Sequence, residues 1–237
     1  DSVPSDLSVY FLQKHFHERY GHYASRVSGR MGRAAGGVSG GTVASLMYVA
    51  EQASKDASIR DIVMDPYALY PPGMEKGSDK PDQAGIAWDD GFGSWTGPFV
   101  MAAINTKVVR RSHALAGLPY GADFRYDESQ LCSSRAKAIL SAGGLGTVMA
   151  GTFFSPTRAL LKKLLPNPGE GPNKETRDKG FFEFWAHGTD GENTLRVKVT
   201  GQRDPGYGAT SRMLAQAGLC LTEDELAVGG GIWTPAS

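Results

Sequence analysis

Phe181-Phe182-Glu183-Phe184-Trp185-Ala186 and Thr194-Leu195-Arg196-Val197-Lys198-Val199 stand on either side of a short loop that contains Asp190-Gly191. Both stretches are rich in aromatic and β-branched residues, which favour strands. An Asp-Gly pair between two such runs is typical of a β-hairpin turn. The sequence therefore predicts two adjacent antiparallel strands at this point.

Helical and strand-like stretches alternate along the rest of the chain. Helices are predicted at residues 7–20, 43–51, 107–115, 135–165 and from 209 to about 221, and strands at 22–32 and 121–133. Asn105 and Thr106 are expected to cap the helix at 107–115, and the Pro- and Gly-rich residues 65–95 are expected to form a long surface loop. This order indicates an α+β fold, with a largely antiparallel or mixed sheet flanked by helices.

Composition narrows the class of protein. The 237 residues are 41% hydrophobic and 21% charged, which is typical of one large soluble domain, or of one domain and part of another. Lys plus Arg equal Asp plus Glu at 25 each, so no net charge favours nucleic acid as a partner. No apolar run approaches the ~20 residues of a transmembrane helix. Two distant cysteines and five histidines without ligand spacing predict neither disulfides nor a metal site, and the reducing cytoplasm is the expected location.

The 31 glycines cluster between the periodic segments rather than in one linker. Residues 36–42 form a glycine-rich loop that leads into a helix, an arrangement that can bind an anion through free backbone N–H groups. The loop lacks the Walker lysine and the GxGxxG spacing. Anion or cofactor contact and simple close packing both remain open for it.

Four further side chains have two interpretations each. Arg110 and Arg111 fall at the start of a predicted helix, where a cation favours an anionic partner; that partner is either a ligand or a carboxylate of the same fold. Tyr207 and Thr210 open the last helix beside glycines, so their hydroxyls either face a cleft or serve in a cap or in packing. No GxSxG elbow or cysteine-protease signature is present, which favours a reaction whose reactive group comes from a bound cofactor.

Five motifs, in order, resemble those of saccharopine dehydrogenase-like oxidoreductases. They are DSVPSDL at 1–7, SGGTVAS at 39–45, NTKVVRRSHAL at 105–115, DPGYGAT at 204–210 and GGGIWTP at 229–235. Within that family the chain is most similar to the trans-acting enoyl reductase branch. The resemblance implies an NAD- or NADP-dependent enzyme of lipid metabolism that acts on an unsaturated acyl or similar small-molecule substrate, and a homodimer.

The resemblance also implies that a Rossmann domain precedes Asp1 and that this half alone is inactive. Residues 1–20 would be the junction after that domain, 21–206 the substrate and dimerisation domain, and 207–237 a helix and loop returning toward it. The residues implied near the cofactor are Asp1, Ser2, Val3, Pro4, Ser5 and Asp6. Those implied around the substrate are Ser39, Gly40, Gly41, Thr42, Ser45, Asn105, Arg110, Arg111 and Thr210, and Tyr207 is the expected proton donor.

Two other functions remain open. A saccharopine-type amino-acid dehydrogenase would need arginines that converge on two carboxylates. A non-catalytic dimerisation or lipid-interaction module would expose Phe153, Phe154, Leu160 and Leu161 as one patch.

Overall fold

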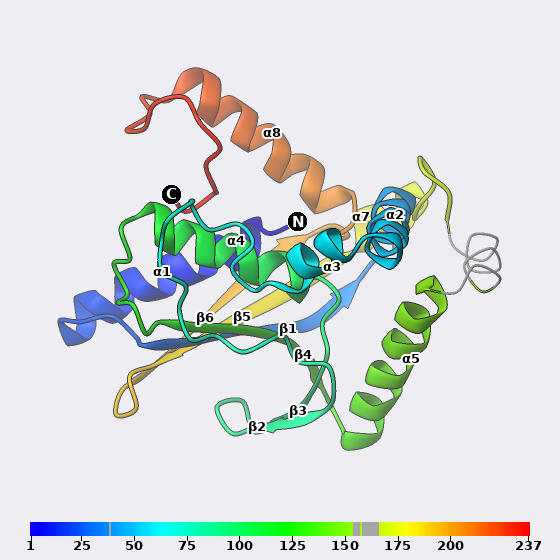
Figure 1. The fold of residues 1–237 in the computed structure, drawn as a ribbon, viewed down its shortest axis with the longest axis horizontal. Helices are drawn as coiled ribbons and strands as arrows, with labels where there is room; N and C mark the ends of the chain where they lie inside the picture. Colours follow the sequence, from blue (N-terminus) through cyan, green and yellow to red (C-terminus); the bar gives the residue numbers. More distant parts are fainter. Residues whose placement is uncertain (38, 154–156, 158–165) are drawn as a thin grey trace.

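A six-stranded mixed sheet forms the centre of the computed structural model (Figure 1), which describes residues 1–237 except 38, 154–156 and 158–165. The strand order is β2-β3-β4-β1-β5-β6, with β1 and β4 parallel and the other neighbours antiparallel. The bounds are β1 Arg26–Ala35, β2 Ala87–Asp89, β3 Ser94–Gly97, β4 Arg125–Cys132, β5 Phe181–Thr189 and β6 Thr194–Gln202. The α+β class and the mixed sheet are confirmed.

The predicted hairpin is confirmed as β5 and β6, which pair from Phe181 with Gln202 to Thr189 with Thr194. Gly191 has a positive φ of 104°, a conformation that glycine adopts without strain. The carboxylate of Asp190 accepts hydrogen bonds from the backbone N–H groups of Glu192 and Asn193. The Asp-Gly pair therefore closes the turn as its sequence predicts.

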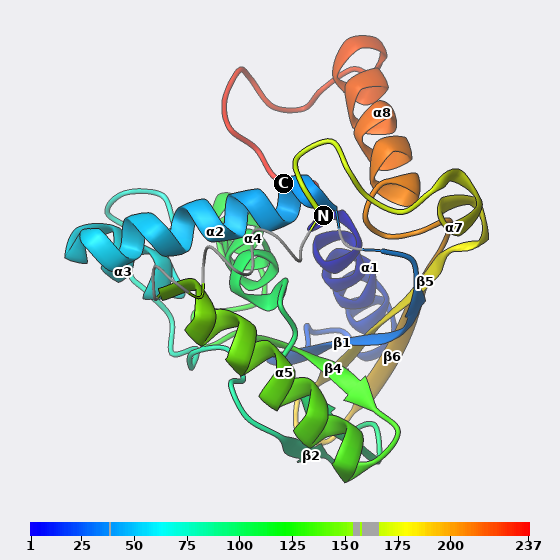
Figure 2. The same ribbon diagram turned by 90° about the vertical axis from the view of Figure 1, so that its right-hand side faces the viewer.

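Helices α1 (Val3–Tyr20) and α4 (Ala102–Leu115) pack side by side on one face of the sheet, as Figures 1 and 2 both show. α1 inserts Val9, Leu12 and Phe16, all at most 1% exposed, toward the strands. Each such side chain contributes about 1.5–3 kcal/mol of burial free energy. The main core consists of Val9, Leu12, Phe16, Ala24, Val27, Val109, Phe124, Tyr126 and Ala186.

The remaining helices lie outside this core. α5 packs on β3 and β4, and α8 extends away from the sheet (Figure 1). Their bounds are α2 Gly40–Lys55, α3 Ala57–Met64, α5 Arg135–Phe153, α7 Lys174–Lys179 and α8 Gly208–Glu223. Within the described ranges, no helix is both long and apolar enough to cross a membrane.

Several predicted boundaries were wrong. α4 begins at Ala102, so Asn105 and Thr106 lie inside the helix and cap nothing; both side chains are buried and bonded to other elements. β1 begins at Arg26 rather than at residue 22, and the predicted loop 65–95 contains β2 and the start of β3. The helix predicted at 135–165 is described from Arg135 to Phe153. Beyond Phe153 only Thr157 is described, and residues 154–156 and 158–165 lie outside the described residues.

Arg110 holds the long loop against α4. Its Nε donates to Asp79 Oδ2 at 2.5 Å, and Nη2 donates to the Tyr126 carbonyl at 2.9 Å. Asp79 Oδ1 accepts from the Tyr126 N–H at 3.0 Å. Because both side chains are at most 5% exposed, this ion pair joins the loop, α4 and β4 within the interior.

Asp79→Asn is therefore expected to lower the free energy of unfolding by roughly 3–5 kcal/mol, because it leaves the Arg110 guanidinium buried without its counter-charge. Urea denaturation measures the change. Lys76→Ala is the control: it removes an ion pair with Asp65 whose lysine is 59% exposed, and a change of at most about 1 kcal/mol is expected. Equal, small effects in both variants would contradict the role assigned to Asp79.

Candidate functional site

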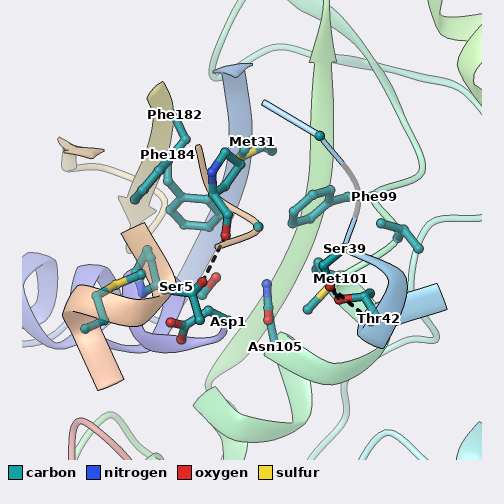
Figure 3. A pocket seen from close by; sticks show the side chains of 17 residues that line it. Asp1, Ser5, Met31, Ser39, Thr42, Phe99, Met101, Asn105, Phe182 and Phe184 are labelled. Carbon is teal, nitrogen blue, oxygen red and sulfur yellow. Dashed lines mark hydrogen bonds between the residues drawn. The ribbon is translucent and has the colours of Figure 1, made fainter. Parts of the chain in front are cut away.

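An apolar cavity of about 310 Å³ lies where the first turn of α1 meets α4, the start of α2, strands β1 and β5 and the turn before α8 (Figure 3). Its apolar lining is Pro4, Met31, Gly37, Phe99, Val100, Met101, Phe182, Phe184, Pro205, Gly206 and Met213. Its polar lining is Asp1, Ser5, Ser39, Thr42, Asn105 and Thr210. Such a cavity, largely apolar with a few convergent polar groups, is the usual form of a small-molecule site.

Two polar caps shape the turns that wall the cavity. Ser39 caps α2: its Oγ accepts from the Thr42 N–H at 3.1 Å and lies 2.8 Å from Thr42 Oγ1. Asp204 is fully buried, and its carboxylate accepts from the N–H groups of Gly206, Tyr207 and Gly208. These bonds satisfy backbone donors at the starts of both helices and so fix the two turns.

The glycines of these turns meet other parts of the chain closely. A Cβ on Gly36 would lie 2.6 Å from the Asp204 Cβ, and one on Gly206 would lie 2.8 Å from the Gly37 carbonyl oxygen. A Cβ on Gly40 would overlap the Asn167 backbone. The close-packing interpretation accounts for these glycines, while Ser39 and Thr42 face the cavity.

A buried hydrogen-bond network lies at the base of the cavity. Asn105 donates through Nδ2 to Glu128 Oε2 at 2.9 Å, and its Oδ1 accepts from Ser2 Oγ at 2.9 Å. Tyr126 donates its hydroxyl to Glu128 Oε1 at 2.7 Å, and the Ser5 hydroxyl lies close enough to the same carboxyl group to lower its pKa. The first turn of α1, the first half of α4 and strand β4 therefore meet at one carboxyl group.

Glu128 has no contact with water, because its exposure is 0%. Burial raises the pKa of its carboxyl group to about 7, although the hydrogen bonds from Tyr126 and Asn105 and the nearby Ser5 hydroxyl act in the opposite direction. Sequence reasoning missed Glu128. The available signal was its position two residues after Tyr126 in a predicted strand, which places both side chains on one face of the sheet but does not show that helices cover that face.

The structure gathers about half of the predicted site residues. Those that line the cavity are Asp1, Pro4, Ser5, Ser39, Thr42, Asn105 and Thr210, and Ser2 lies one hydrogen bond behind Asn105. Those that do not line it are Val3, Asp6, Gly40, Gly41, Ser45, Arg110, Arg111 and Tyr207. The SGGTVAS and DPGYGAT motifs thus share one cavity.

Some residues outside the cavity make identifiable structural contacts. Tyr207 donates its hydroxyl to the Glu170 carbonyl at 3.1 Å. Arg111 donates to the carbonyls of Leu69 and Ile232. Asp6 accepts from Ser112 Oγ at 2.6 Å and from the Ala236 N–H at 2.9 Å, and burial raises its pKa to about 6. Asp6 and Arg111 thereby hold the C-terminal segment against α1 and α4.

Proteins named as trans-acting enoyl reductases are similar to this chain along its whole length. One from Mycobacterium tuberculosis, which bears the name provisionally, is 37% identical over 254 residues. Others from Mycobacterium bovis and Mycobacterium leprae are 35% and 30% identical. In each case the alignment covers 100% of this chain and 60% of the relative. These homologues support a relationship to an enoyl reductase family.

Two other comparisons gave no match. No protein-family model matches the chain, and no solved structure matches it significantly.

The raised pKa of Glu128 predicts how stability changes with pH. Between the ordinary value of 4.5 and about 7, the folded state retains a proton that the unfolded state has released, so stability falls as pH rises through this range. Glu128→Gln removes this pH-dependent contribution to the free energy of unfolding. Relative to wild type, the variant is expected to gain roughly 2 kcal/mol between pH 5.5 and 8.

Urea denaturation at several pH values measures the difference between the two proteins, in which the contributions of Asp6 and the histidines cancel. Glu192→Gln, at an exposed carboxyl in the hairpin loop, is the matched control and should run parallel to wild type. A Glu128→Gln curve that also runs parallel to wild type would show that Glu128 titrates normally.

Proposed function

We propose that this chain forms the substrate-binding half of an NAD(P)-dependent enoyl reductase and that the cavity binds the unsaturated acyl group. The apolar lining and the polar base carry this proposal, because an enoyl substrate combines a hydrocarbon chain with one polar carbonyl. The names of the homologues support the reaction class. The chain spans 60% of the length of these relatives, so the activity of the whole protein is part of the proposal.

Asn105 is the residue best placed to orient the substrate carbonyl. Its side chain lines the cavity, and its orientation is fixed because Oδ1 accepts from Ser2 while Nδ2 donates to Glu128. Nδ2 carries a second N–H group, which is available to a carbonyl oxygen. Ser39, Thr42 and Thr210 use their hydroxyls in bonds within the fold, so they would shape the wall rather than polarise the substrate.

The residues of this chain fit a nicotinamide ring better than a whole dinucleotide. The glycine turns pack against their own backbone, and no lysine or arginine belongs to the described cavity lining. A pyrophosphate therefore finds no cradle among these residues. We place the dinucleotide-binding domain in the part of the relatives that this chain does not cover, with residues 1–6 at the junction where the nicotinamide would enter.

The described residues argue against one of the two rival functions and leave the other untested. A saccharopine-type dehydrogenase would need converging arginines, whereas Arg110 is committed to Asp79 and neither Arg110 nor Arg111 lines the described cavity. A lipid-interaction module predicts an exposed patch of Phe153, Phe154, Leu160 and Leu161. Phe154, Leu160, Leu161 and the side chain of Phe153 all lie outside the described part of the structure. Homodimer formation and a cytoplasmic location remain predictions.

Reduction of an enoyl thioester by the complete gene product, with NADPH or NADH as reductant, tests the proposal. Met213→Trp, which enlarges a side chain in the cavity wall, is expected to lower kcat/KM at least about tenfold by blocking the acyl group. Leu214→Trp is the matched control, since the neighbouring leucine on α8 is 72% exposed and does not line the cavity. Equal activity of both variants would show that the reaction does not use the cavity.

The role predicted for Tyr207 as proton donor needs its own test. Its phenol is bonded to the Glu170 carbonyl, so the role requires the side chain to turn into the cavity. Tyr207→Phe in the complete protein removes only the hydroxyl. A loss of roughly a hundredfold or more in kcat would support the role, and unchanged turnover would eliminate it.

A further inference from the structure

Glu128 is a buried carboxyl group that lies one hydrogen bond from the cavity. Ser5 and Asn105 both contact it, and both line the cavity. Asn105 and Tyr126 donate hydrogen bonds to it, and the Ser5 hydroxyl lies close enough to influence its pKa. Within the described ranges no lysine, arginine or histidine forms an ion pair with it, and the cation that acts on it is the N-terminal ammonium of Asp1. A fully buried carboxyl group that is not bonded to a cation is costly as an anion, which favours its protonated form.

Ser5 differs from the other hydroxyls of the cavity. Ser39 and Thr42 bond to each other, and Thr210 donates to the Pro205 carbonyl on its own turn. Ser5 instead contacts the Glu128 carboxyl on one side and lines the cavity on the other. Figure 3 shows Ser5 beside Asp1 and across from Asn105, at the end of the cavity formed by the first turn of α1.

We propose that Glu128 stores the proton consumed by the reaction and that the Ser5 hydroxyl passes it to the substrate. This inference rests on the proposed enoyl reductase function and assigns the proton to Ser5 and Glu128 in place of Tyr207, which does not line the cavity. Ser5 is the catalytic residue in this scheme because it would touch the substrate, and Glu128 acts through it.

A hydride and a proton together saturate the double bond. A reduced nicotinamide supplies a hydride to the β-carbon of the enoyl group, and the electron pair of the double bond moves toward the carbonyl. The α-carbon then takes the proton of the Ser5 hydroxyl, and the Ser5 oxygen takes the proton of the Glu128 carboxyl. The products are a saturated acyl group and a Glu128 carboxylate, which regains its proton from solvent before the next turnover.

The surroundings of Glu128 suit it to this task near neutral pH. Its pKa of about 7 leaves a large fraction protonated, and the proton is weakly enough held to be given up. The titratable groups that face it are the phenol of Tyr126 from β4, the carboxyl of Asp82 from the long loop, and the N-terminal ammonium of Asp1, two residues before α1. The pKa of Tyr126 lies well above 10, so its phenol stays protonated and keeps donating to Glu128.

Three substitutions in the complete protein test the proposal. Glu128→Gln keeps the shape of the side chain but holds no transferable proton, and Ser5→Ala breaks the path to the cavity. Each is expected to lower kcat roughly 10²–10⁴-fold while KM changes less than about twofold. Tyr126→Phe removes a bond that favours the carboxylate, so the pH above which turnover falls should move upward from about 7.

An infrared titration without substrate supplies a readout that does not depend on activity. The band of the protonated Glu128 carboxyl should disappear near pH 7 in wild type and in Ser5→Ala, and at higher pH in Tyr126→Phe. It should be missing at every pH in Glu128→Gln. Glu192→Gln is the control and should retain both the band and full turnover.

The outcomes separate the two proposals. A wild-type protein that reduces enoyl thioesters, with full kcat and an unchanged pH profile in Ser5→Ala and Glu128→Gln, overturns the proton path and leaves the enoyl reductase function intact. A wild-type protein that reduces none of the enoyl thioesters overturns both. If Glu128→Gln does not fold, Ser5→Ala and the shift in Tyr126→Phe decide, and failure of either expected effect rejects the path.

Discussion

The hydrogen bonding of one buried carboxyl group constrains the geometry of the cavity. Glu128 cannot be solvated, so α1, α4 and β4 must each present a partner to it, which they do through Ser5, Asn105 and Tyr126. The neighbouring strand leaves the necessary room: Gly29 pairs with Glu128, and a Cβ there would lie 2.6 Å from the Tyr126 hydroxyl. Displacing any of these elements leaves a buried polar group unsatisfied, which costs about 1–3 kcal/mol.

The charged groups of the interior are separated from the cavity. Arg110 and Asp79 neutralise each other beneath the long loop, and Arg30 forms a second buried cluster with Asp89 and Asp127 at 2.6 Å to each. These pairs connect segments distant in sequence without placing a cation beside the cavity. The cavity therefore retains a largely apolar wall with Glu128 behind it, and this environment preserves the raised pKa of Glu128.

Local patterns in the sequence predicted the hairpin and the α+β class, because strand-forming residues around Asp190-Gly191 specify their own turn. The start of α4 was predicted wrongly because Asn105 has the character of a cap residue, whereas its side chain is bonded to Glu128, 23 residues away. Motif resemblance predicted roles near the cofactor for Ser5 and around the substrate for Ser39, Asn105 and Thr210, and the structure places all four in the lining of one cavity. Alternation along the predicted strand places Glu128 on the same face as Tyr126, but only the packing of α1 and α4 shows that its carboxyl group is fully buried.

The parts that bound the cavity differ in how readily they can adapt. Its base belongs to the sheet and to α1 and α4, where Asn105 and Glu128 are at most 2% exposed and hydrogen bonded. Its wall includes Met31, Met101 and Met213, whose unbranched side chains adjust to irregular apolar shapes. Substitutions in the rigid base and in the adaptable wall are therefore expected to have different effects. Under the proposed enoyl reductase function, changes in the methionines should alter which acyl chains fit. Changes at the base should instead alter the chemistry common to all of them, because every enoyl substrate would present the same reacting carbons to it.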